Sequence, residues 1–164
     1  MTGVSPLDAS GLLAALSAGG IDFVVIGGFA VSAHGYPRAT KDLDIVPAPD
    51  VENLKRLAAV LQKLNATLLG VEEFPAEEIV QPDADGLAMG GNFVLATSSG
   101  RLDVMQLVAP DLEFGELADA SVEDEVFGHQ VRFCSYEHLV AMKEAAGRPE
   151  DLLDLERLRQ ARGE

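Results

Sequence analysis

Two aspartates, Asp42 and Asp44, stand two residues apart in the run DLDIV. Successive side chains of a β-strand point to opposite faces, so this spacing places both carboxylates on one face and turns Leu43 and Ile45 towards the core. Two carboxylates this close repel each other unless a proton or a cation neutralises them. Oxygen ligands of this kind suit Mg²⁺, which takes one or two carboxylates together with substrate phosphates. The alternative is a solvated strand edge, in a chain with 27 acidic residues.

A third carboxylate, Asp103, interrupts the otherwise apolar run LDVMQLV on an expected strand. An unpaired carboxylate in such a strand costs free energy. If this strand lies beside residues 42–46, three carboxylates converge. They then form the ligand set of a two-metal site, which stabilises the attacking and leaving oxygens in phosphoryl transfer. The alternative is an ion pair with Arg101, two residues away on the same strand face.

A pair of glycines, Gly27 and Gly28, ends the apolar run IDFVVI and precedes a short helix. The backbone N–H groups at a helix N-terminus bind anions, and residues without a side chain let a phosphate come close. The alternative is a tight strand-to-helix turn without a ligand, because short glycine motifs also match by chance.

Two groups of charged side chains accompany these motifs. Arg38 and Lys41 precede the aspartate pair in a chain with only 12 basic residues, and we expect them to face phosphates. Their alternative is a solvated cationic loop. Asp151 and Asp154 share one face of a helix, and a glycine turn can bring Lys143 back towards them. The alternative for this cluster is a surface ion pair worth about 0.2–1 kcal/mol.

The remaining reactive side chains point to packing roles. His34 ends a short helix, and capping or packing is favoured over metal binding because aspartate sites prefer hard cations. Cys134 lies in a strand-like run and is expected to be a small core residue. A single cysteine cannot form an internal disulfide, which fits a reducing compartment.

The composition excludes several classes of protein. The length of 164 residues favours one domain, residues 1–164, and 48% hydrophobic with 24% charged residues is typical of a globular protein. The net charge of −15 argues against a broad nucleic-acid surface, although a bound metal can supply positive charge locally. There is no basic leader before an apolar run and no apolar stretch of about 18 residues, so we expect a cytoplasmic protein without membrane contact.

Apolar spacing and turn residues predict a mixed α/β fold, in which a central sheet is flanked by helices and a C-terminal helical hairpin over 135–164 packs on it. The final helix has an expected apolar stripe of Leu152, Leu155 and Leu158. Residues 66–90 are read as a short strand over 67–71 followed by an acidic loop. A hairpin turn is expected at Gly128 and His129. The expected helices cover 6–17, 29–34, 51–64, 136–146 and the residues after 149, and the main strands cover 21–26, 42–46, 92–97 and 101–108.

These motifs resemble the nucleotidyltransferase superfamily, which is related to DNA polymerase beta. The pattern is a Gly-Gly turn, thirteen residues, then Asp-x-Asp on a strand and a later third aspartate. The stretch VVIGGFAVSAHGYPRATKDLDI is similar to minimal bacterial nucleotidyltransferases, including the toxin-like branch related to abortive-infection AbiEii proteins. The tail SYEHLVAMKEAAGRPEDLLDLERL resembles that branch's helical lysine followed by Arg-x-x-Asp-x-x-Asp. The resemblance covers residues 21–46, 101–107 and 135–158.

The resemblance implies a reaction and roles for individual residues. The reaction is metal-dependent transfer of a nucleoside monophosphate from an NTP to a hydroxyl acceptor, with release of pyrophosphate. The acceptor is an RNA end such as that of tRNA, a protein side chain or a small molecule. Asp42, Asp44 and Asp103 would hold Mg²⁺ or Mn²⁺, with Asp103 helping to activate the attacking hydroxyl and Lys143 also catalytic. The expected nucleotide-binding residues are Gly27, Gly28, Arg38, Thr40, Lys41, Asp151 and Asp154, with Tyr36 a further candidate beside Thr40 for base or ribose contact.

Two other functions remain open from the sequence. The domain can bind a nucleotide or a partner protein without turnover, since many active members carry serine where this chain has Gly28. It can also be the toxin-like half of a toxin–antitoxin pair. The net charge of −15 then favours a basic partner such as a cognate antitoxin.

Overall fold

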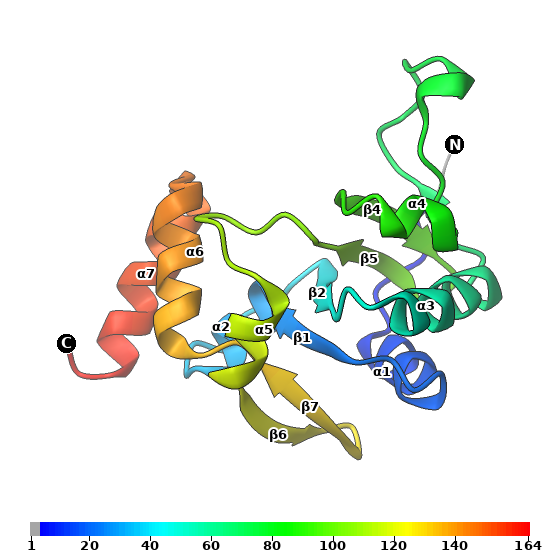
Figure 1. Cartoon of the computed structure of the whole chain (residues 1–164). Helices are drawn as coiled ribbons and strands as arrows, with labels where there is room; N and C mark the ends of the chain where they lie inside the picture. The colour runs from blue at the N-terminus through cyan, green and yellow to red at the C-terminus, as the bar shows by residue number, and fades with distance from the viewer. Residues whose placement is uncertain (1–3) are drawn as a thin grey trace.

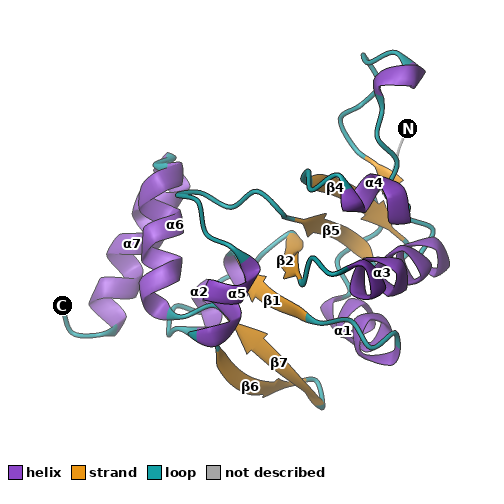
Figure 2. Ribbon diagram, viewed as in Figure 1, coloured by secondary structure: helices purple, strands orange, loops and turns teal. Residues whose placement is uncertain are grey.

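A seven-stranded mixed sheet forms the centre of the fold, in the order β3-β4-β5-β2-β1-β7-β6 (Figures 1 and 2). The computed structural model describes residues 4–164. The strands are β1 (Phe23–Ile26), β2 (Asp42–Pro47), β3 (Thr67–Leu68), β4 (Phe93–Thr97), β5 (Gly100–Val104), β6 (Val122–Val126) and β7 (His129–Phe133).

Helices flank this sheet, and the last two stand side by side as a hairpin at one end of the molecule (Figure 1). The predicted mixed α/β architecture, with a central sheet, flanking helices and a C-terminal helical hairpin, is therefore confirmed. No helix in the part of the chain described, residues 4–164, combines the length and the apolar character needed to cross a bilayer. The helices are α1 (Ala9–Ala18), α2 (Gly28–Ala33), α3 (Val51–Lys63), the 3₁₀ helix η1 (Ala76–Glu78), α4 (Ala84–Ala88), α5 (Phe114–Asp119), α6 (Tyr136–Ala146) and α7 (Pro149–Ala161).

The central strands fix the register of the site. Strand β2 pairs in parallel with β5 and antiparallel with β1, so it has a neighbour on both edges. Its alternate residues Leu43 and Ile45 are completely buried, as the two-residue period requires. Asp42 and Asp44 alternate with these two residues and therefore project from the opposite face of the sheet. There Asp44 stands level with Asp103.

Two element boundaries differ from expectation because side chains bind backbone groups. Helix α1 begins at Ala9, since the Asp8 carboxylate accepts a hydrogen bond of 2.9 Å from the backbone N–H of Gly11 and caps the helix there. Strand β5 ends at Val104 instead of reaching residue 108. The side-chain oxygen of Asn92 accepts the backbone N–H groups of residues 106 and 107, each at 2.8 Å, and these groups leave the strand ladder.

The segment 66–90 contains more structure than its sequence indicated. Strand β3 has two residues instead of five, and η1 and α4 lie where a loop was expected. Helix α4 begins after Asp83, whose carboxylate accepts a 2.8 Å hydrogen bond from the backbone N–H of Gly86, and it buries Leu87 completely. Between β3 and α4 the chain extends away from the sheet (Figure 1). Helix α5 was also missed, because only Leu117 of its six residues is buried.

The turn between β6 and β7 lies one residue earlier than expected. Phe127 and Gly128 have φ angles of 51° and 79°, and His129 is already the first residue of β7. Positive φ at both central residues is typical of a type I′ turn, which matches the twist of a two-residue hairpin.

Candidate active site

Four charged side chains form a compact group on one face of the sheet. Asp42 stands level with Arg101, and Asp44 stands level with Asp103, because β2 and β5 run parallel in this register. One carboxylate oxygen from each aspartate lies within 4.8 Å of the other two. The structure thus brings together the three carboxylates that the sequence singled out; metal binding by them stays a prediction.

The alternative interpretation of Asp103 is also realised. Nε and Nη2 of Arg101 donate hydrogen bonds of 2.9 Å to the two carboxylate oxygens of Asp103, and Nε lies 3.5 Å from an oxygen of Asp42. Arg101 therefore belongs to the acidic group. Its position two residues before Asp103 indicated the ion pair, but the sequence did not indicate its contact with Asp42.

Burial and repulsion between carboxylates favour protonation of Asp42 and Asp44. Burial, followed by the charges of Asp42 and Asp103, raises the pKa of Asp44 to about 8. Burial and the charge of Asp103 also raise the pKa of Asp42, although Arg101 opposes the shift. The three carboxylates can each direct an oxygen atom to one shared position, and the nearby positive charge is too small to neutralise them. Such a ligand set fits a hard divalent cation such as Mg²⁺ or Mn²⁺.

This arrangement predicts how stability depends on pH in protein treated with a chelator. The pKa of Asp44 is about 8 in the folded state against an ordinary value of 3.8, so the folded state binds more protons over this interval and stability falls as pH rises. We expect a lower melting temperature at about pH 8.5 than at about pH 5.5. The Asp44→Asn variant cannot ionise here and should show a smaller decrease. An equal decrease in both proteins would contradict the assignment.

The glycine turn lies beside the acidic group because Ile26, the last residue of β1, pairs with Asp44. Gly27 has a φ of 71°, and a Cβ atom there would overlap the Asp44 carboxylate. At Gly28 a Cβ atom would lie 2.7 Å from the hydroxyl oxygen of Thr40. Both positions therefore require glycine for reasons of space, and phosphate binding by this turn stays a prediction.

We expect Gly27→Ala to lower the free energy of unfolding by about 3 kcal/mol or more, because strain and overlap add. Gly20→Ala is the matched control: Gly20 has a φ of 68° but no atom within 4 Å of the added Cβ. Only backbone strain acts there, at about 1–2 kcal/mol. Urea unfolding measures both variants. Equal losses would show that the Asp44 carboxylate moves aside without cost.

The loop that precedes β2 is hydrogen-bonded to helix α7 and to β2 itself. Arg38 donates hydrogen bonds of 2.9 and 3.0 Å to the two carboxylate oxygens of Asp154 on α7. The hydroxyl of Thr40 donates a 3.1 Å hydrogen bond to the backbone carbonyl of Asp42. Lys41 is exposed and, like Arg38 and Thr40, lines a cavity beside the acidic group. The prediction that Arg38 faces phosphates did not foresee its partner on α7; nucleotide contacts by Arg38, Thr40 and Lys41 stay predictions.

The C-terminal hairpin buries a second charged cluster. Nζ of Lys143 lies 3.1 Å from a carboxylate oxygen of Asp151 and 2.9 Å from one of Asp154. The three side chains are 10%, 1% and 4% exposed, so the alternative of a surface ion pair is wrong. The expected apolar stripe of α7 is also wrong at Leu152, which is exposed, because Asp151 and Asp154 take the inward positions beside Leu155.

Arg148 completes this cluster and was quoted only as part of the tail motif. Its Nε donates a 2.7 Å hydrogen bond to Asp151, and its backbone N–H donates to the same oxygen at 3.2 Å. Burial by itself would raise the pKa of Asp151, but the hydrogen bonds from Arg148 and Lys143 outweigh it and lower that pKa. The i, i+3 spacing of Arg148 and Asp151 at a helix start was the available signal.

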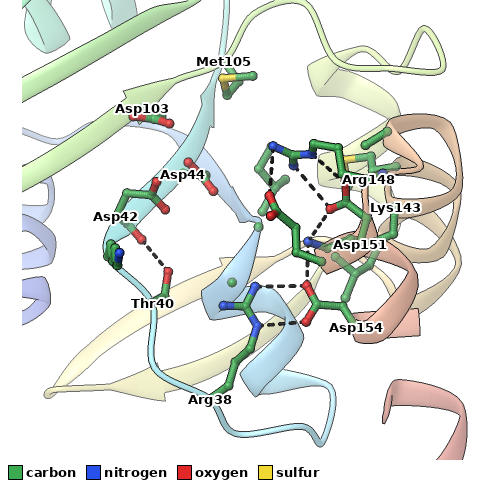
Figure 3. Close-up of a pocket in the computed structure, with 18 of the residues that line it drawn as sticks. Arg38, Thr40, Asp42, Asp44, Asp103, Met105, Lys143, Arg148, Asp151 and Asp154 are labelled. Atoms are coloured by element: carbon green, nitrogen blue, oxygen red, sulfur yellow. Dashed lines mark hydrogen bonds and ion pairs between the residues drawn. The ribbon is translucent and has the colours of Figure 1, made fainter. Parts of the chain in front are cut away.

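The two charged groups face each other across one cavity of about 700 Å³. Figure 3 shows the aspartates of β2 and β5 on one side, and Arg38, Lys143 and Arg148 with their aspartate partners on the other. Apolar side chains line the space between them. These include Met105 and Met142, which belong to no motif, so the sequence could not identify them as cavity residues.

His34 and Cys134 have packing environments. Nε2 of His34 lies 2.7 Å from the backbone carbonyl oxygen of Cys134, and its imidazole packs edge-on against Tyr136. Cys134 is buried, and burial raises the pKa of its thiol to about 12. A thiol in this state is a poor nucleophile, which agrees with the core role expected for Cys134.

The similarity to known proteins lies in three-dimensional structure. No protein-family model and no curated protein sequence matches the chain. The lincosamide antibiotic adenylyltransferase LnuA, solved with lincomycin bound, superposes with a TM-score of 0.63 at 14% identity, over 96% of this chain and 99% of LnuA.

Two further solved proteins have related structures. The antibiotic-resistance factor ANT(2'')-Ia gives a TM-score of 0.58 at 17% identity, over 92% of this chain and 80% of that protein. A candidate nucleotidyltransferase from Thermotoga maritima gives 0.52 at 17% identity, over 92% and 87%. At these identities the comparison establishes architecture: the chain has the nucleotidyltransferase fold.

Proposed function

We propose that the protein is a metal-dependent nucleotidyltransferase that moves a nucleoside monophosphate from an NTP to a hydroxyl acceptor and releases pyrophosphate. The observation that carries this proposal is the convergence of Asp42, Asp44 and Asp103 within 4.8 Å at one wall of the cavity. Cations on the opposite wall, Arg38 and Arg148, supply positive charge for a triphosphate. The nucleotidyltransferase fold of the chain supports the same reaction class.

The chemistry of such a reaction is mainly positioning and charge neutralisation. The oxygen of the acceptor hydroxyl forms a bond to the α-phosphorus, while the bond from that phosphorus to the pyrophosphate oxygen breaks and the hydroxyl proton leaves. A bound Mg²⁺ would supply charge neutralisation for the phosphate oxygens. Asp42, Asp44 and Asp103 would hold it. Asp103, beside the other two in register, would also orient the attacking hydroxyl and accept its proton.

The opposite wall would bind the triphosphate of the nucleotide. Arg38 and Arg148 each present a guanidinium to the cavity while an aspartate of α7 fixes its orientation. Planar guanidinium groups bind phosphate oxygens in a two-point geometry. Lys143 is buried with both its aspartate partners and so holds this wall of the cavity in place, and its catalytic role stays part of the proposal.

The acceptor is the open part of this proposal. LnuA and ANT(2'')-Ia are solved with lincomycin and with adenylyl-2''-tobramycin, so small hydroxyl-bearing molecules belong on the list of acceptors to test. An RNA end or a protein side chain is the alternative. The net charge of −15 restricts an RNA acceptor to a few local contacts.

The proposal includes membership of the toxin-like branch. The support is the tail motif formed by Lys143, Arg148, Asp151 and Asp154, together with the net charge of −15, which suits a basic antitoxin. Co-expression with the genes that flank its own gene, followed by co-purification, would test this part separately. Recovery of no stoichiometric basic partner would remove it and leave the reaction class untouched.

The decisive experiment incubates the purified protein with Mg²⁺, each labelled NTP in turn, and separate pools of RNA, protein and small molecules. We expect pyrophosphate release and transfer of the label to one pool, with loss of both in the presence of a chelator. Nucleotide binding without pyrophosphate release in any pool would overturn the enzymatic proposal. It would instead support a nucleotide-binding module.

A further inference from the structure

Arg101 differs from the other cations of the site in the aspartates with which it pairs. Among the described residues, 4–164, Asp42 and Asp103 of the candidate metal site form ion pairs, and in both the partner is Arg101. The other two guanidinium groups facing the cavity, those of Arg38 and Arg148, pair with the aspartates of α7. Arg101 is therefore the local counter-ion of this acidic group.

The register of the sheet explains why Arg101 can pair with two of these aspartates. Arg101 and Asp103 are alternate residues of β5 and lie on the same face as the two aspartates of β2. On its other edge β5 pairs with β4, where the residue level with Arg101 is the small Ala96. From this position Nε reaches two different carboxylates, at 2.9 Å in Asp103 and 3.5 Å in Asp42.

We propose that Arg101 is a built-in counter-ion of the acidic group and competes with a divalent metal ion for Asp103. This inference rests on the metal site of the proposed function. Both oxygens of Asp103 accept a hydrogen bond from the guanidinium, so a metal ion must either displace Arg101 or bind beside a positive charge. Either course weakens metal binding, because like charges at a few ångströms repel strongly in a partly buried site.

The competing role for Arg101 is orientation of Asp103. Hydrogen bonds to a ligating carboxylate commonly fix its direction and strengthen metal binding. The two roles predict opposite effects for a substitution that removes the charge. They also differ for a substitution that keeps the charge and loses the two-point geometry, because lysine is a compact point charge.

The experiment measures Mn²⁺ binding in the absence of nucleotide, from the electron paramagnetic resonance signal of free Mn²⁺. The proteins are the wild type, Arg101→Gln and Arg101→Lys. The matched control is Arg132→Gln, since Arg132 also lies on a strand, pairs with Asp22 away from the cavity and has a side chain 29% exposed against 39% for Arg101. Circular dichroism checks that each variant is folded.

Competition predicts that Arg101→Gln binds Mn²⁺ about tenfold or more tightly than the wild type. It also predicts that Arg101→Lys and Arg132→Gln stay within about threefold of the wild type. Unchanged or weaker binding by Arg101→Gln would overturn the inference. If that variant does not fold, Arg101→Lys decides, because weakened binding there shows an orienting role.

The same data separate this inference from the function on which it rests. Absence of Mn²⁺ binding in both the wild type and Arg101→Gln would remove the metal site, and both proposals would fail together. Wild-type binding that Arg101→Gln does not strengthen would remove only the counter-ion role and leave the nucleotidyltransferase proposal in place.

Discussion

Replacing Asp42 by asparagine is expected to lower the rate of nucleotidyl transfer by a factor of about 10³ or more. The substitution keeps the shape of the side chain but removes one of the three carboxylates that converge within 4.8 Å. A reaction that depends on charge neutralisation and positioning loses most of its acceleration when one metal ligand is lost. Release of labelled pyrophosphate from the NTP, followed over time, measures the effect.

The control for this substitution is Asp119→Asn. Asp119 is an exposed residue of α5 outside the cavity, so the same chemical change there should leave the rate within about twofold. The melting temperatures of both variants show whether the fold is preserved. A folded Asp42→Asn protein with nearly normal turnover would mean that the acidic group is not the catalytic centre.

Replacing Lys143 by methionine is expected to lower the free energy of unfolding by about 3–5 kcal/mol. Methionine has a similar length, so little packing is lost. However, the substitution leaves the carboxylates of Asp151 and Asp154 without their shared lysine at 1% and 4% side-chain exposure. Arg148 and Arg38 still pair with these carboxylates, but the loss of one positive charge from a buried cluster is far more costly than a broken pair in water. Urea denaturation at neutral pH measures the change.

Lys55→Met provides the matched control. Lys55 also pairs with an acidic residue, Glu52, but at 3.9 Å and with side chains 61% and 74% exposed. Exposed pairs of this kind contribute about 0–1 kcal/mol, so this variant should unfold almost like the wild type. Similar losses in the two lysine variants would show that burial of the Lys143 cluster adds nothing to stability.

The local parts of the site could be read from the sequence because short-range geometry determines them. The two-residue strand period places Asp42 and Asp44 on one face whatever surrounds them. The glycine turn and the helix that follows it likewise follow from the strand and turn signals, and Gly27 indeed adopts a positive φ. Each of these features depends on residues close together in the chain.

The C-terminal hairpin shows where such inference fails. The leucine spacing of α7 indicated an apolar stripe through Leu152, yet the helix turns Asp151 and Asp154 inward. Hydrophobic periodicity assumes that charged side chains face solvent. Here Lys143 and Arg38 neutralise these aspartates from other elements, so the usual penalty for burying charge is offset. No pattern within one helix carries that information.

Sequence alone determined the longer helices and the central strands, the acidic strand and the glycine turn of this protein, because backbone sterics and side-chain period act over a few residues. Tertiary structure decided which charges meet. The parallel pairing of β2 with β5 puts Asp44 level with Asp103, and the docking of α7 joins Arg38 to Asp154 across 116 positions. Electrostatic energy depends on distance in space, and distance in space between remote residues is set only when the sheet and the helices pack together.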